Sequence, residues 1–387
     1  MRAVHRRLLL AGAVATCLAA AATLPVLADD SASLVKVTAA HGTPVPGQYI
    51  VTLKPGASTD AAAKNVKAGG VKRFDGVLNG FAAKLSSDQL NELRHDDRVA
   101  AIEQDQVVKA NTTQKSPLPW GLDRIDQRSS KLSKSYYYKS SGSGVTAYII
   151  DTGLDVTHSD FGGRASVAWA ASRFGGDGGD CNGHGTHVAG IIGSKTYGAA
   201  KSVNLRALRV LDCEGSGYMS DVVAAAQWLR TNAAKPAVAN LSLGGSKSAA
   251  VNTAMTNLSK SGVFVSVAAG NDNKDACNYS PSSAGWVMAV GATTVYDNRA
   301  TFSNWGKCVD INAPGYGIWS TWPGGGAEKL SGTSMATPYV SGVAALYLST
   351  HKSAAFPEVQ AWLNNNSTHS LKRLRSQANR LLYKGTL

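Results

Sequence analysis

Three short segments contain the residue types that a nucleophilic serine requires. Asp151 follows a run of apolar residues, His184 lies in the segment Asn-Gly-His-Gly-Thr-His, and Ser334 lies in the segment Gly-Thr-Ser-Met-Ala-Thr-Pro. A serine hydroxyl is a poor nucleophile at neutral pH because it holds its proton. It needs an imidazole that accepts this proton and a carboxylate that orients the imidazole and stabilises its charged form. The chain therefore contains a candidate nucleophile, base and orienting carboxylate, in the order Asp, His, Ser.

Each segment taken alone also has a simpler interpretation. Asp151, which Thr and Gly follow, is typical of a turn after a strand. His184 and His187 lie three residues apart at the start of an apolar segment, so either is a candidate base, but no HExxH carboxylate supports a metal-binding pair. Ser334 begins a predicted helix that continues to Leu348, which places it at the positive end of a helix dipole. A serine there caps the helix, and capping does not exclude a nucleophilic role.

The N-terminal residues are typical of an export signal. Three arginines within the first seven residues precede the apolar run from Leu8 to Leu24, and Val-Leu-Ala at 26–28 is a small-residue cleavage site. We predict that residues 1–28 are removed on secretion to the extracellular space. A membrane anchor is disfavoured because the run is shorter than the roughly 20 residues of a spanning helix. No later segment is long and apolar enough to span a bilayer, so no stable membrane association is expected.

The formal net charge of +13 raises the question of a nucleic-acid partner. Residues 1–110 contain 13 Lys/Arg and 10 Asp/Glu, a net charge of +3. Residues 111–387 contain the other 26 Lys/Arg and 16 Asp/Glu, a net charge of +10. This excess is dispersed, without a basic run or an interleaved aromatic platform. A basic soluble surface is the favoured interpretation, and no nucleic-acid partner is expected. Nothing marks an oligomer interface, and a monomer is the default expectation.

The cysteine count points to disulfides. Of five cysteines, Cys17 lies in the predicted signal, which leaves Cys181, Cys213, Cys277 and Cys308. An even number in an exported chain predicts two disulfides, for which three pairings are possible. A metal site is the alternative, but no CxxC spacing supports it.

Hydrophobic periodicity divides the exported chain into two parts. In the first, strands are predicted at 48–53, 80–85 and 99–108 and helices at 60–68 and 86–94. This pattern indicates a small α+β domain of the βαββ type at about residues 47–109. A polar, Pro-containing link at 111–119 follows it.

From Trp120 onward the pattern changes to α/β. Near-continuous apolar strands are predicted at 145–150, 204–211, 238–243, 263–268 and 287–290, with helices at 184–192, 219–231 and 248–261. Strands that alternate with helices indicate a doubly wound, mainly parallel sheet. Active residues of such sheets lie at the carboxyl ends of strands, which is where Asp151 is expected.

The three segments, together with Ala-Ala-Gly-Asn at 268–271, resemble the subtilisin-like serine proteases, most closely the proteinase K and aqualysin group. The resemblance extends over about residues 48–383. It implies a catalytic triad formed by Asp151, His184 and Ser334. Of the two histidines it implies His184, and not His187, as the base. It also implies that the Asn271 side chain and the Ser334 backbone N–H bind the developing oxyanion.

The resemblance also implies which residues bind the substrate. The walls of the primary specificity pocket correspond to Ser242, Leu243, Gly244, Gly245, Ala268, Ala269 and Gly270. The strand that pairs with the substrate backbone corresponds to Gly215, Ser216 and Gly217. Small, uncharged walls imply an apolar or aromatic residue before the scissile bond, and main-chain pairing implies broad specificity for proteins and peptides. The proteinase K pattern has a tyrosine where this chain has Met219, one residue after Tyr218, so preference further from the cleaved bond is left open.

Disulfide pairing and calcium binding are further implications of the resemblance. Cys181 would pair with Cys213, and Cys277 with Cys308. One calcium site would combine the Asp310 carboxylate with the carbonyls of Gly285 and Val287. A second would comprise Asp123, Asp126, Gln127, Ser133 and Ser135. Without the resemblance these residues are ordinary helix-start and turn residues.

The small first domain resembles the inhibitory propeptide of the family, which assists folding and is then removed. The implied organisation is a signal peptide (1–28), a propeptide (29–110) and a catalytic domain (111–387), with cleavage near Ala110 to Thr113. We therefore predict a secreted serine endopeptidase of broad specificity, made as a self-processed zymogen that its own propeptide inhibits.

Three alternatives are weighed against this prediction. Sedolisin-type acid peptidases are the nearest in chemistry, but they use a glutamate where this chain has His184. A binding protein on an inactive protease scaffold is the second, and nothing missing from the triad favours it. An α/β-hydrolase esterase is disfavoured because no GxSxG segment surrounds Ser334.

Overall fold

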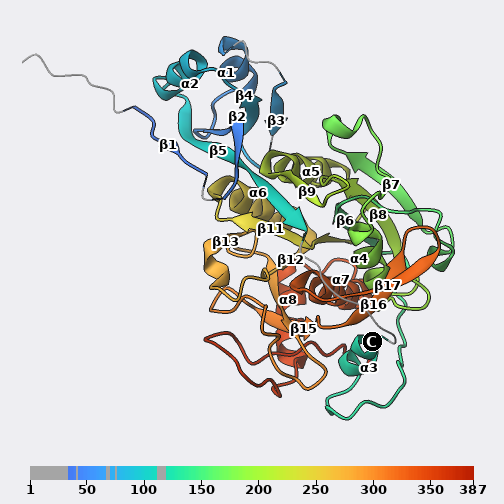
Figure 1. The fold of residues 1–387 in the computed structure, drawn as a ribbon. Coiled ribbons are helices and arrows are strands. Elements are labelled where there is room, and N and C mark those ends of the chain that lie inside the picture. The colour runs from blue at the N-terminus through green and yellow to red at the C-terminus, as the bar shows by residue number, and fades with distance from the viewer. Residues whose placement is uncertain (1–33, 41, 67–69, 75, 111–118) are drawn as a thin grey trace, which may run out of the picture. The chain divides into compact units, whose positions relative to one another are not determined.

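The computed structural model describes residues 34–40, 42–66, 70–74, 76–110 and 119–387. The predicted signal peptide (1–28) and most of the predicted cleavage region, residues 111–113, lie outside the described residues. Within the described residues, no helix has the length and apolar character needed to cross a membrane. A small α+β part ends at Ala110, and an α/β part begins at Pro119 (Figure 1).

The first part is a mainly antiparallel sheet with two helices packed on it. Its elements are β1 Val37–Thr38, β2 Pro44–Leu53, α1 Thr59–Asn65, β3 Lys72–Phe74, β4 Gly80–Lys84, α2 Ser87–Arg94 and β5 Val99–Ala110. β2 pairs with β4 and β5, and β3 pairs with β4. Val51, Phe81 and Ile102 are fully buried in the core between sheet and helices. The sequence analysis did not predict β3, which is only three residues long and contains Lys72 and Arg73.

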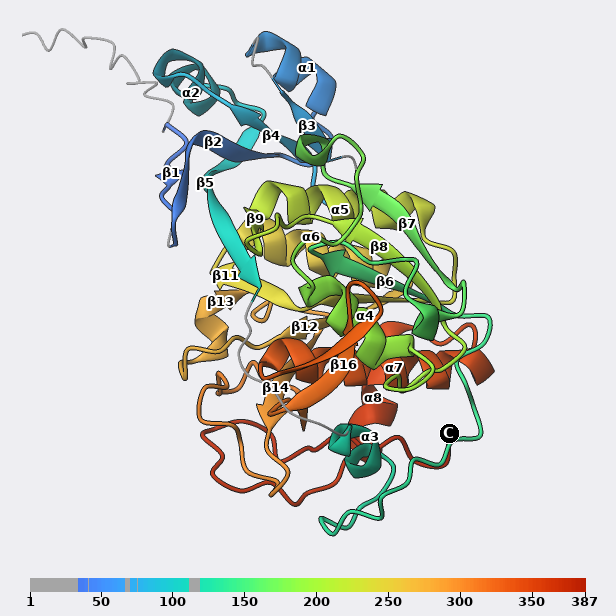
Figure 2. The ribbon, with the colours of Figure 1, turned by 45° about the vertical axis from the view of Figure 1, so that its right-hand side comes forward.

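The second part is built on a seven-stranded sheet in the order β15-β14-β12-β10-β6-β8-β7, in which every pair is parallel. These strands are β6 Thr146–Asp151, β7 Ala165–Ala170, β8 Asn204–Arg209, β10 Ala237–Leu241, β12 Val263–Ala268, β14 Met288–Thr293 and β15 Ile311–Pro314. The helices are α3 Trp120–Ile125, α4 His184–Gly193, α5 Met219–Asn232, α6 Ala249–Lys260, α7 Thr333–Thr350 and α8 Phe356–Asn366. The predicted doubly wound α/β fold is confirmed (Figure 2).

Two hydrophobic cores cover the two faces of this sheet. One contains apolar side chains of α4 and α7, and the other contains those of α5 and α6. Successive strand residues point to opposite faces, so Ile149 belongs to the first core and Ile150 to the second, and both are fully buried. This double burial explains why the strands are near-continuous apolar runs in the sequence.

Several short strands lie outside this sheet. They are β9 Ser216–Tyr218, β11 Leu243–Ser246, β13 Tyr279–Ser280 and the hairpin of β16 Ile318–Trp322 with β17 Gly326–Leu330. Short 3-10 turns lie at Ser159–Phe161, Ser172–Phe174 and Ala276–Asn278. The strand predicted at 238–243 was wrong at its end, because β10 stops at Leu241 and the chain turns into β11, which belongs to a different sheet.

Candidate active site

Asp151 and His184 meet at the carboxyl edge of the parallel sheet. Asp151 is the last residue of β6, and His184 is the first residue of α4. The Asp151 Oδ1 atom lies 2.6 Å from His184 Nδ1, and both side chains are buried. The carboxylate therefore accepts the Nδ1–H proton, which leaves Nε2 as the nitrogen that can accept a proton from a substrate or a nucleophile. Asp151 Oδ1 also accepts the Thr152 backbone N–H at 2.8 Å, which holds the carboxylate in place.

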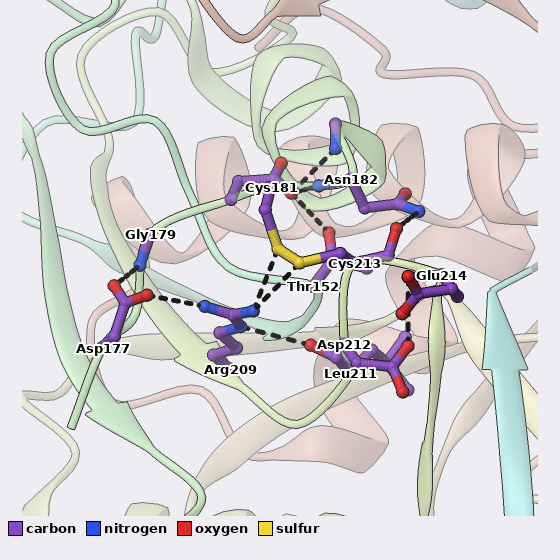
Figure 3. The surroundings of a disulfide bond; sticks show 12 residues. Thr152, Asp177, Gly179, Cys181, Asn182, Arg209, Leu211, Asp212, Cys213 and Glu214 are labelled. Atoms are coloured by element: carbon purple, nitrogen blue, oxygen red, sulfur yellow. Dashed lines mark hydrogen bonds and ion pairs between the residues drawn. A yellow bond between two sulfur atoms is a disulfide. The ribbon is translucent and has the colours of Figure 1, made fainter. Parts of the chain in front are cut away.

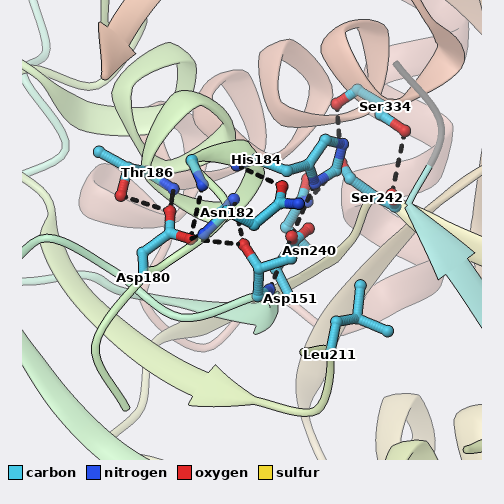
Figure 4. A network of polar contacts seen from close by, with 12 residues as sticks. Asp151, Asp180, Asn182, His184, Thr186, Leu211, Asn240, Ser242 and Ser334 are labelled. Atoms are coloured by element: carbon cyan, nitrogen blue, oxygen red, sulfur yellow. Dashed lines mark hydrogen bonds and ion pairs between the residues drawn. The ribbon is translucent and has the colours of Figure 1, made fainter. Parts of the chain in front are cut away.

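Ser334 lies in the first turn of α7, on the other side of the imidazole from Asp151 (Figure 4). Its Oγ donates to the Ser242 carbonyl at 3.0 Å, and Ser242 Oγ donates to the Ser334 carbonyl at 2.7 Å. This reciprocal pair ties the start of α7 to the segment that follows β10. Ser334 thus lies beside the Asp151–His184 pair (Figure 4), but its hydroxyl is bonded to Ser242, and His184 Nε2 has no hydrogen-bond partner among the described residues.

The Asn271 side chain has a fixed orientation next to Ser334. Asn271 Oδ1 accepts both the backbone N–H and the Oγ1–H of Thr333, each at 2.9 Å. Because an amide is planar, these two bonds direct the Nδ2 group away from Thr333. Gly270 precedes Asn271 with φ +100°, a conformation that favours glycine, and its backbone N–H donates to Thr333 Oγ1 at 3.1 Å. Thr333 was not among the predicted site residues, since no pattern in the sequence links it to Asn271.

The end of β5 lies between the two strands that the resemblance assigns to substrate binding. Lys109 pairs antiparallel with Ser216 of β9 on one side and with Gly244 of β11 on the other. Gly217 must remain small, because a Cβ there would come within 2.3 Å of the Val210 carbonyl. A chain in this position adds a central strand to a three-stranded antiparallel sheet.

A cavity of about 270 Å³ opens beside these strands. Its lining includes predicted pocket residues Gly244, Gly245, Ala268, Ala269 and Gly270 and also Gly42, Thr43, Val107, Ser246, Asp272, Tyr279, Ser280 and Ser282. The pair formed by Asp272 and Tyr279 was missed by the sequence prediction. Burial and the neighbouring Asp272, which accepts a hydrogen bond, raise the pKa of Tyr279 to about 12. The predicted wall residues in this lining are small and uncharged, but the lining also contains the Asp272 carboxylate.

Two disulfides hold loops of the candidate site, with the pairing that the resemblance implies. Cys181 pairs with Cys213 and Cys277 pairs with Cys308, at sequence separations of 32 and 31 residues. The first joins the segment before α4 to the loop before β9 (Figure 3). Arg209 Nη2 lies 3.0 Å from the Cys181 sulfur. Closing a loop of this length contributes about 3 to 4 kcal/mol on the chain-entropy model.

The residues of the two implied calcium sites are oxygen-rich but already bonded within the protein. Asp123 accepts the Ser133 N–H and hydroxyl at 2.9 Å and the Lys134 N–H at 2.6 Å. Gln127 donates to two backbone carbonyls, and the hydroxyls of Ser133 and Ser135 lie 2.8 Å apart. Asp126 Oδ2 accepts the Tyr137 N–H, whereas its buried Oδ1 has no partner among the described residues.

The second implied calcium site contains a poorly compensated carboxylate. Burial raises the pKa of Asp310 to about 6, although its Oδ2 accepts the Ala289 N–H at 2.8 Å. The Gly285 carbonyl accepts the Thr256 hydroxyl at 2.7 Å. The described residues contain no cluster of three or more His, Cys, Asp or Glu side chains that could hold a metal ion. Any metal at either site would therefore depend on carbonyl and hydroxyl oxygens as well.

His187, the second histidine of the segment, is a structural residue. It is fully buried, and its Nε2 lies 3.2 Å from the Ile318 carbonyl and 3.0 Å from the Glu328 carbonyl. Carbonyls only accept, so Nε2 carries the proton and donates to the β16–β17 hairpin. Burial, with a smaller contribution from His184, lowers the pKa of His187 to about 3.

This depressed pKa predicts a loss of stability in acid. The unfolded chain binds a proton on His187 near pH 6.5, whereas the folded protein binds it only near pH 3, so stability present above pH 6.5 is lost as the pH falls towards 3. Between pH 7 and 4.5 the expected loss in unfolding free energy is about 3 kcal/mol. Urea unfolding midpoints of a Ser334→Ala chain, with and without His187→Gln, measure it. Equal pH dependence in both chains would contradict this assignment.

Comparison with known proteins agrees with this geometry. The subtilase family model matches residues 142–381, and the peptidase inhibitor I9 model matches residues 48–111. Alkaline serine exoprotease A of Vibrio alginolyticus is 49% identical, over 80% of this chain and 59% of the relative. The extracellular serine proteinase of Thermus sp. (strain Rt41A) is 44% identical, over 93% of this chain and 94% of the relative. Proteinase R of Parengyodontium album is 43% identical, over 82% and 83%.

A solved structure supports the same relationship. The crystal structure of a cold adapted subtilisin-like serine proteinase superposes with a TM-score of 0.68 at 47% identity, over 70% of this chain and 99% of that one. The family model covers more than half of the chain, and the Thermus relative matches along nearly its whole length. The chain belongs to the subtilase family of serine proteases and carries an I9 inhibitor domain before its catalytic domain.

Proposed function

We propose that this chain is a secreted serine endopeptidase that matures by cutting off its own propeptide. The observation that carries the proposal is the buried 2.6 Å contact between Asp151 and His184 at the start of α4, next to Ser334 on α7. In this proposal residues 1–28 are a signal peptide, 29–110 the propeptide and 111–387 the catalytic domain. The mature enzyme acts as a monomer.

The geometry supports acyl transfer in two steps. His184 Nε2 accepts the Ser334 hydroxyl proton as Oγ attacks the peptide carbonyl, and it then gives this proton to the leaving amine. Asp151 keeps Nδ1 protonated and stabilises the imidazolium that forms. The oxyanion of the tetrahedral intermediate is bound by the Ser334 N–H and by Asn271 Nδ2, which Thr333 orients. Water then releases the acyl group through the same residues.

A serine-directed phosphonate tests this assignment directly. The mature enzyme is expected to take up one phosphonate per chain, located on Ser334 by peptide mapping, and to lose hydrolysis in proportion. His184→Ala should prevent the labelling. No labelling of Ser334 would favour a binding protein on an inactive scaffold, and activity confined to acid pH would favour a sedolisin-like chemistry.

The substrate is proposed to bind as β5 does, by main-chain pairing between β9 and β11. Such pairing depends little on side chains, so broad specificity for proteins and peptides is expected. The 270 Å³ cavity has small walls at Gly244 and Ala268 that suit an apolar or aromatic side chain before the scissile bond. A panel of peptides that differ only at this residue measures the preference.

The propeptide is proposed to inhibit the enzyme by occupying the cleft as a product-like strand. Ala110 pairs with Leu243, so the predicted cleavage near Ala110 to Thr113 follows shortly after the paired residues. Two carboxylates of β5 also bind helix N-termini of the catalytic domain. Glu103 accepts the Ser248 hydroxyl at 2.8 Å and the Ala250 N–H at 2.9 Å, at the start of α6.

Asp105 binds the start of α5 in the same way. It is fully buried, and it accepts the Ser220 N–H at 3.2 Å and the Gln48 amide at 2.8 Å. The residue before α5, Tyr218, makes no side-chain capping bond. The propeptide thus supplies a capping acceptor that the helix lacks. An ion pair between Lys72 and Asp221 adds a contact on the same helix.

Removal of these carboxylates should speed activation. Glu103→Gln and Asp105→Asn each remove a charged acceptor worth about 1.5 to 3 kcal/mol. Each substitution should therefore hasten release of the cleaved propeptide by about tenfold or more. The lag before peptide hydrolysis begins measures this release. Glu92→Gln, at an exposed propeptide position, is the matched control, and unaltered lags in the two interface variants would refute the inhibitory contacts.

Calcium is proposed as a structural cofactor at both oxygen-rich sites. The orphaned buried oxygen of Asp126 and the burial of Asp310 fit a cation, which would neutralise charge that the protein compensates poorly. At the first site Asp123, Asp126, Gln127, Ser133 and Ser135 would hold it. At the second, Asp310 would do so with the carbonyls of Gly285 and Val287.

Chelation of calcium should destabilise the phosphonate-inhibited enzyme. A ligand present at 100 times its Kd contributes about 2.7 kcal/mol, so EDTA should lower the thermal unfolding temperature by several degrees. Asp310→Asn and Asp123→Asn should each reduce this response. An unfolding temperature that EDTA does not alter would exclude structural calcium at these residues.

A further inference from the structure

We propose that Asp180 is a positioning residue for the catalytic base. Its carboxylate accepts five hydrogen bonds from residues around the start of α4 (Figure 4). Oδ1 accepts the Thr152 hydroxyl at 2.9 Å and the N–H groups of Asn182 and Gly183 at 3.1 and 2.8 Å. Oδ2 accepts the Thr186 N–H at 2.8 Å and its hydroxyl at 2.6 Å.

The start of α4 requires an acceptor from outside its own cap residue. The first N–H groups of a helix have no partner within the helix. The cap residue here is Gly183, which has φ +106° and no side chain, and a Cβ at this position would come within 2.3 Å of the Trp322 ring. No acidic residue lies in the first turn. A capping side chain is therefore excluded at 183 itself, and the acceptor must come from elsewhere.

Three neighbouring residues replace the missing cap. The N–H groups of residues 184, 185 and 186 donate to Asn182 Oδ1 at 3.2 Å, to Thr152 Oγ1 at 2.9 Å and to Asp180 Oδ2 at 2.8 Å. Thr152 in turn donates to Asp180 Oδ1. Asp180 is the only one of the three with a formal negative charge, which the positive end of the helix dipole favours.

The same carboxylate connects the two partners of the 2.6 Å contact. Thr152 directly follows Asp151 on the end of β6, and Thr186 lies two residues after His184 on α4. Because Asp180 binds both threonines, it sets the separation between the strand end and the helix start. All five of its hydrogen bonds go to this region and none to Ser334, so its effect on catalysis would act through the relative placement of Asp151 and His184.

This inference rests on the proposed role of His184 as the base, and Asp180→Asn tests it. The amide keeps one oxygen that can accept hydrogen bonds. Its NH₂ group replaces the other oxygen and would face either the Thr186 N–H or the N–H groups of Asn182 and Gly183. A misplaced catalytic group costs on the order of 10²-fold in rate. We expect kcat per phosphonate-reactive site to fall by about that factor, with KM unchanged.

Labelling kinetics separate positioning from folding. In Asp180→Asn the rate of phosphonate labelling of Ser334 should fall with kcat, while the final extent stays at one per chain. Asp177→Asn is the matched control, because Asp177 lies in the same loop and binds Gly179 and Arg209, neither of which belongs to α4. The inference would be overturned if kcat per labelled site were normal in Asp180→Asn, even if fewer of its molecules could be labelled.

A second variant keeps the test decisive if Asp180→Asn fails to fold. Thr152→Val is nearly isosteric and removes the hydroxyl that joins Asp180 to the Gly185 N–H. The loss of this bridge should lower kcat about tenfold, equivalent to about one hydrogen bond. Wild-type kcat in this variant would also overturn the inference. By contrast, full activity in His184→Ala would overturn the proposed function itself.

Discussion

Replacing Ser334 by alanine is expected to abolish peptide hydrolysis. Alanine lacks the Oγ atom that attacks the carbonyl, so only binding and oxyanion stabilisation would remain. The expected loss in kcat is about 10⁶-fold, which is the magnitude known for the nucleophilic serine of subtilisin. Hydrolysis of casein and of a chromogenic peptide measures it. The hydrogen bond from Ser334 Oγ to the Ser242 carbonyl is lost, but the Ser242 hydroxyl still donates to the carbonyl of residue 334, so the fold should be preserved.

Two controls accompany this variant. Ser349→Ala removes a serine hydroxyl near the other end of α7, where Oγ donates within the helix to the Leu346 carbonyl, and should leave kcat unchanged. Ser334→Ala would also keep its inhibitory propeptide, which by itself would lower hydrolysis. The second control is therefore the mature wild-type enzyme labelled with phosphonate, which is inactivated at Ser334 but has no propeptide. Substantial hydrolysis by either inactivated form would exclude Ser334 as the nucleophile.

Replacing Asn271 by alanine is expected to lower kcat by about 10²- to 10³-fold, again a magnitude established in subtilisin. The amide would contribute one donor to the oxyanion, and this charge exists only in the transition state and intermediate. An interaction absent from the ground state changes kcat and leaves KM nearly unaltered. Steady-state kinetics with a single peptide separate the two constants.

Thr333 provides a matched pair for this prediction. Thr333→Ser keeps the hydroxyl that donates to Asn271 Oδ1, whereas Thr333→Val removes it. In the valine variant kcat should therefore fall by part of the 10²- to 10³-fold expected for Asn271→Ala. In the serine variant kcat should stay close to that of the wild type. A rise in KM in Asn271→Ala without a fall in kcat would show that Asn271 binds the ground state and not the oxyanion.

Local patterns in the sequence were sufficient for much of the fold. Strands buried on both faces are continuous apolar runs, so β6, β8 and β12 were predicted close to their observed bounds. The sequence also placed Asp151 at a strand end and His184 at a helix start, and these two side chains meet at 2.6 Å. Both disulfides pair as the resemblance implies.

The remaining features depend on contacts between distant residues. β7 was not predicted although five of its six residues are apolar, and in the structure these residues are only partly buried at an edge of the sheet. Ser242 lies in a run that looks like one strand, yet its hydroxyl binds the Ser334 carbonyl 92 residues away and the chain changes sheets there. Asp180 precedes an ordinary Cys-Asn-Gly turn in the sequence. Only the folded arrangement of Thr152 and Thr186 around it reveals five bonds on one carboxylate.

The propeptide interface was predictable only in outline. The first domain was expected to resemble an inhibitory propeptide, and its final strand pairs with β9 and β11. Glu103 and Asp105 are two ordinary acidic residues in a strand, and their contacts lie 115 to 147 residues away along the chain. Alternating residues of a strand face the same side, which lets the pair reach two neighbouring helix N-termini.

The intact mass of the secreted protein, compared between wild type and Ser334→Ala, tests the central claim most directly. Self-processing by this triad predicts that the wild type loses residues up to about 110, with a new N-terminus between residues 111 and 114. The variant should retain the propeptide at full mass under the same conditions. Equal removal of the propeptide from both proteins would contradict the account, because another protease would then mature the chain.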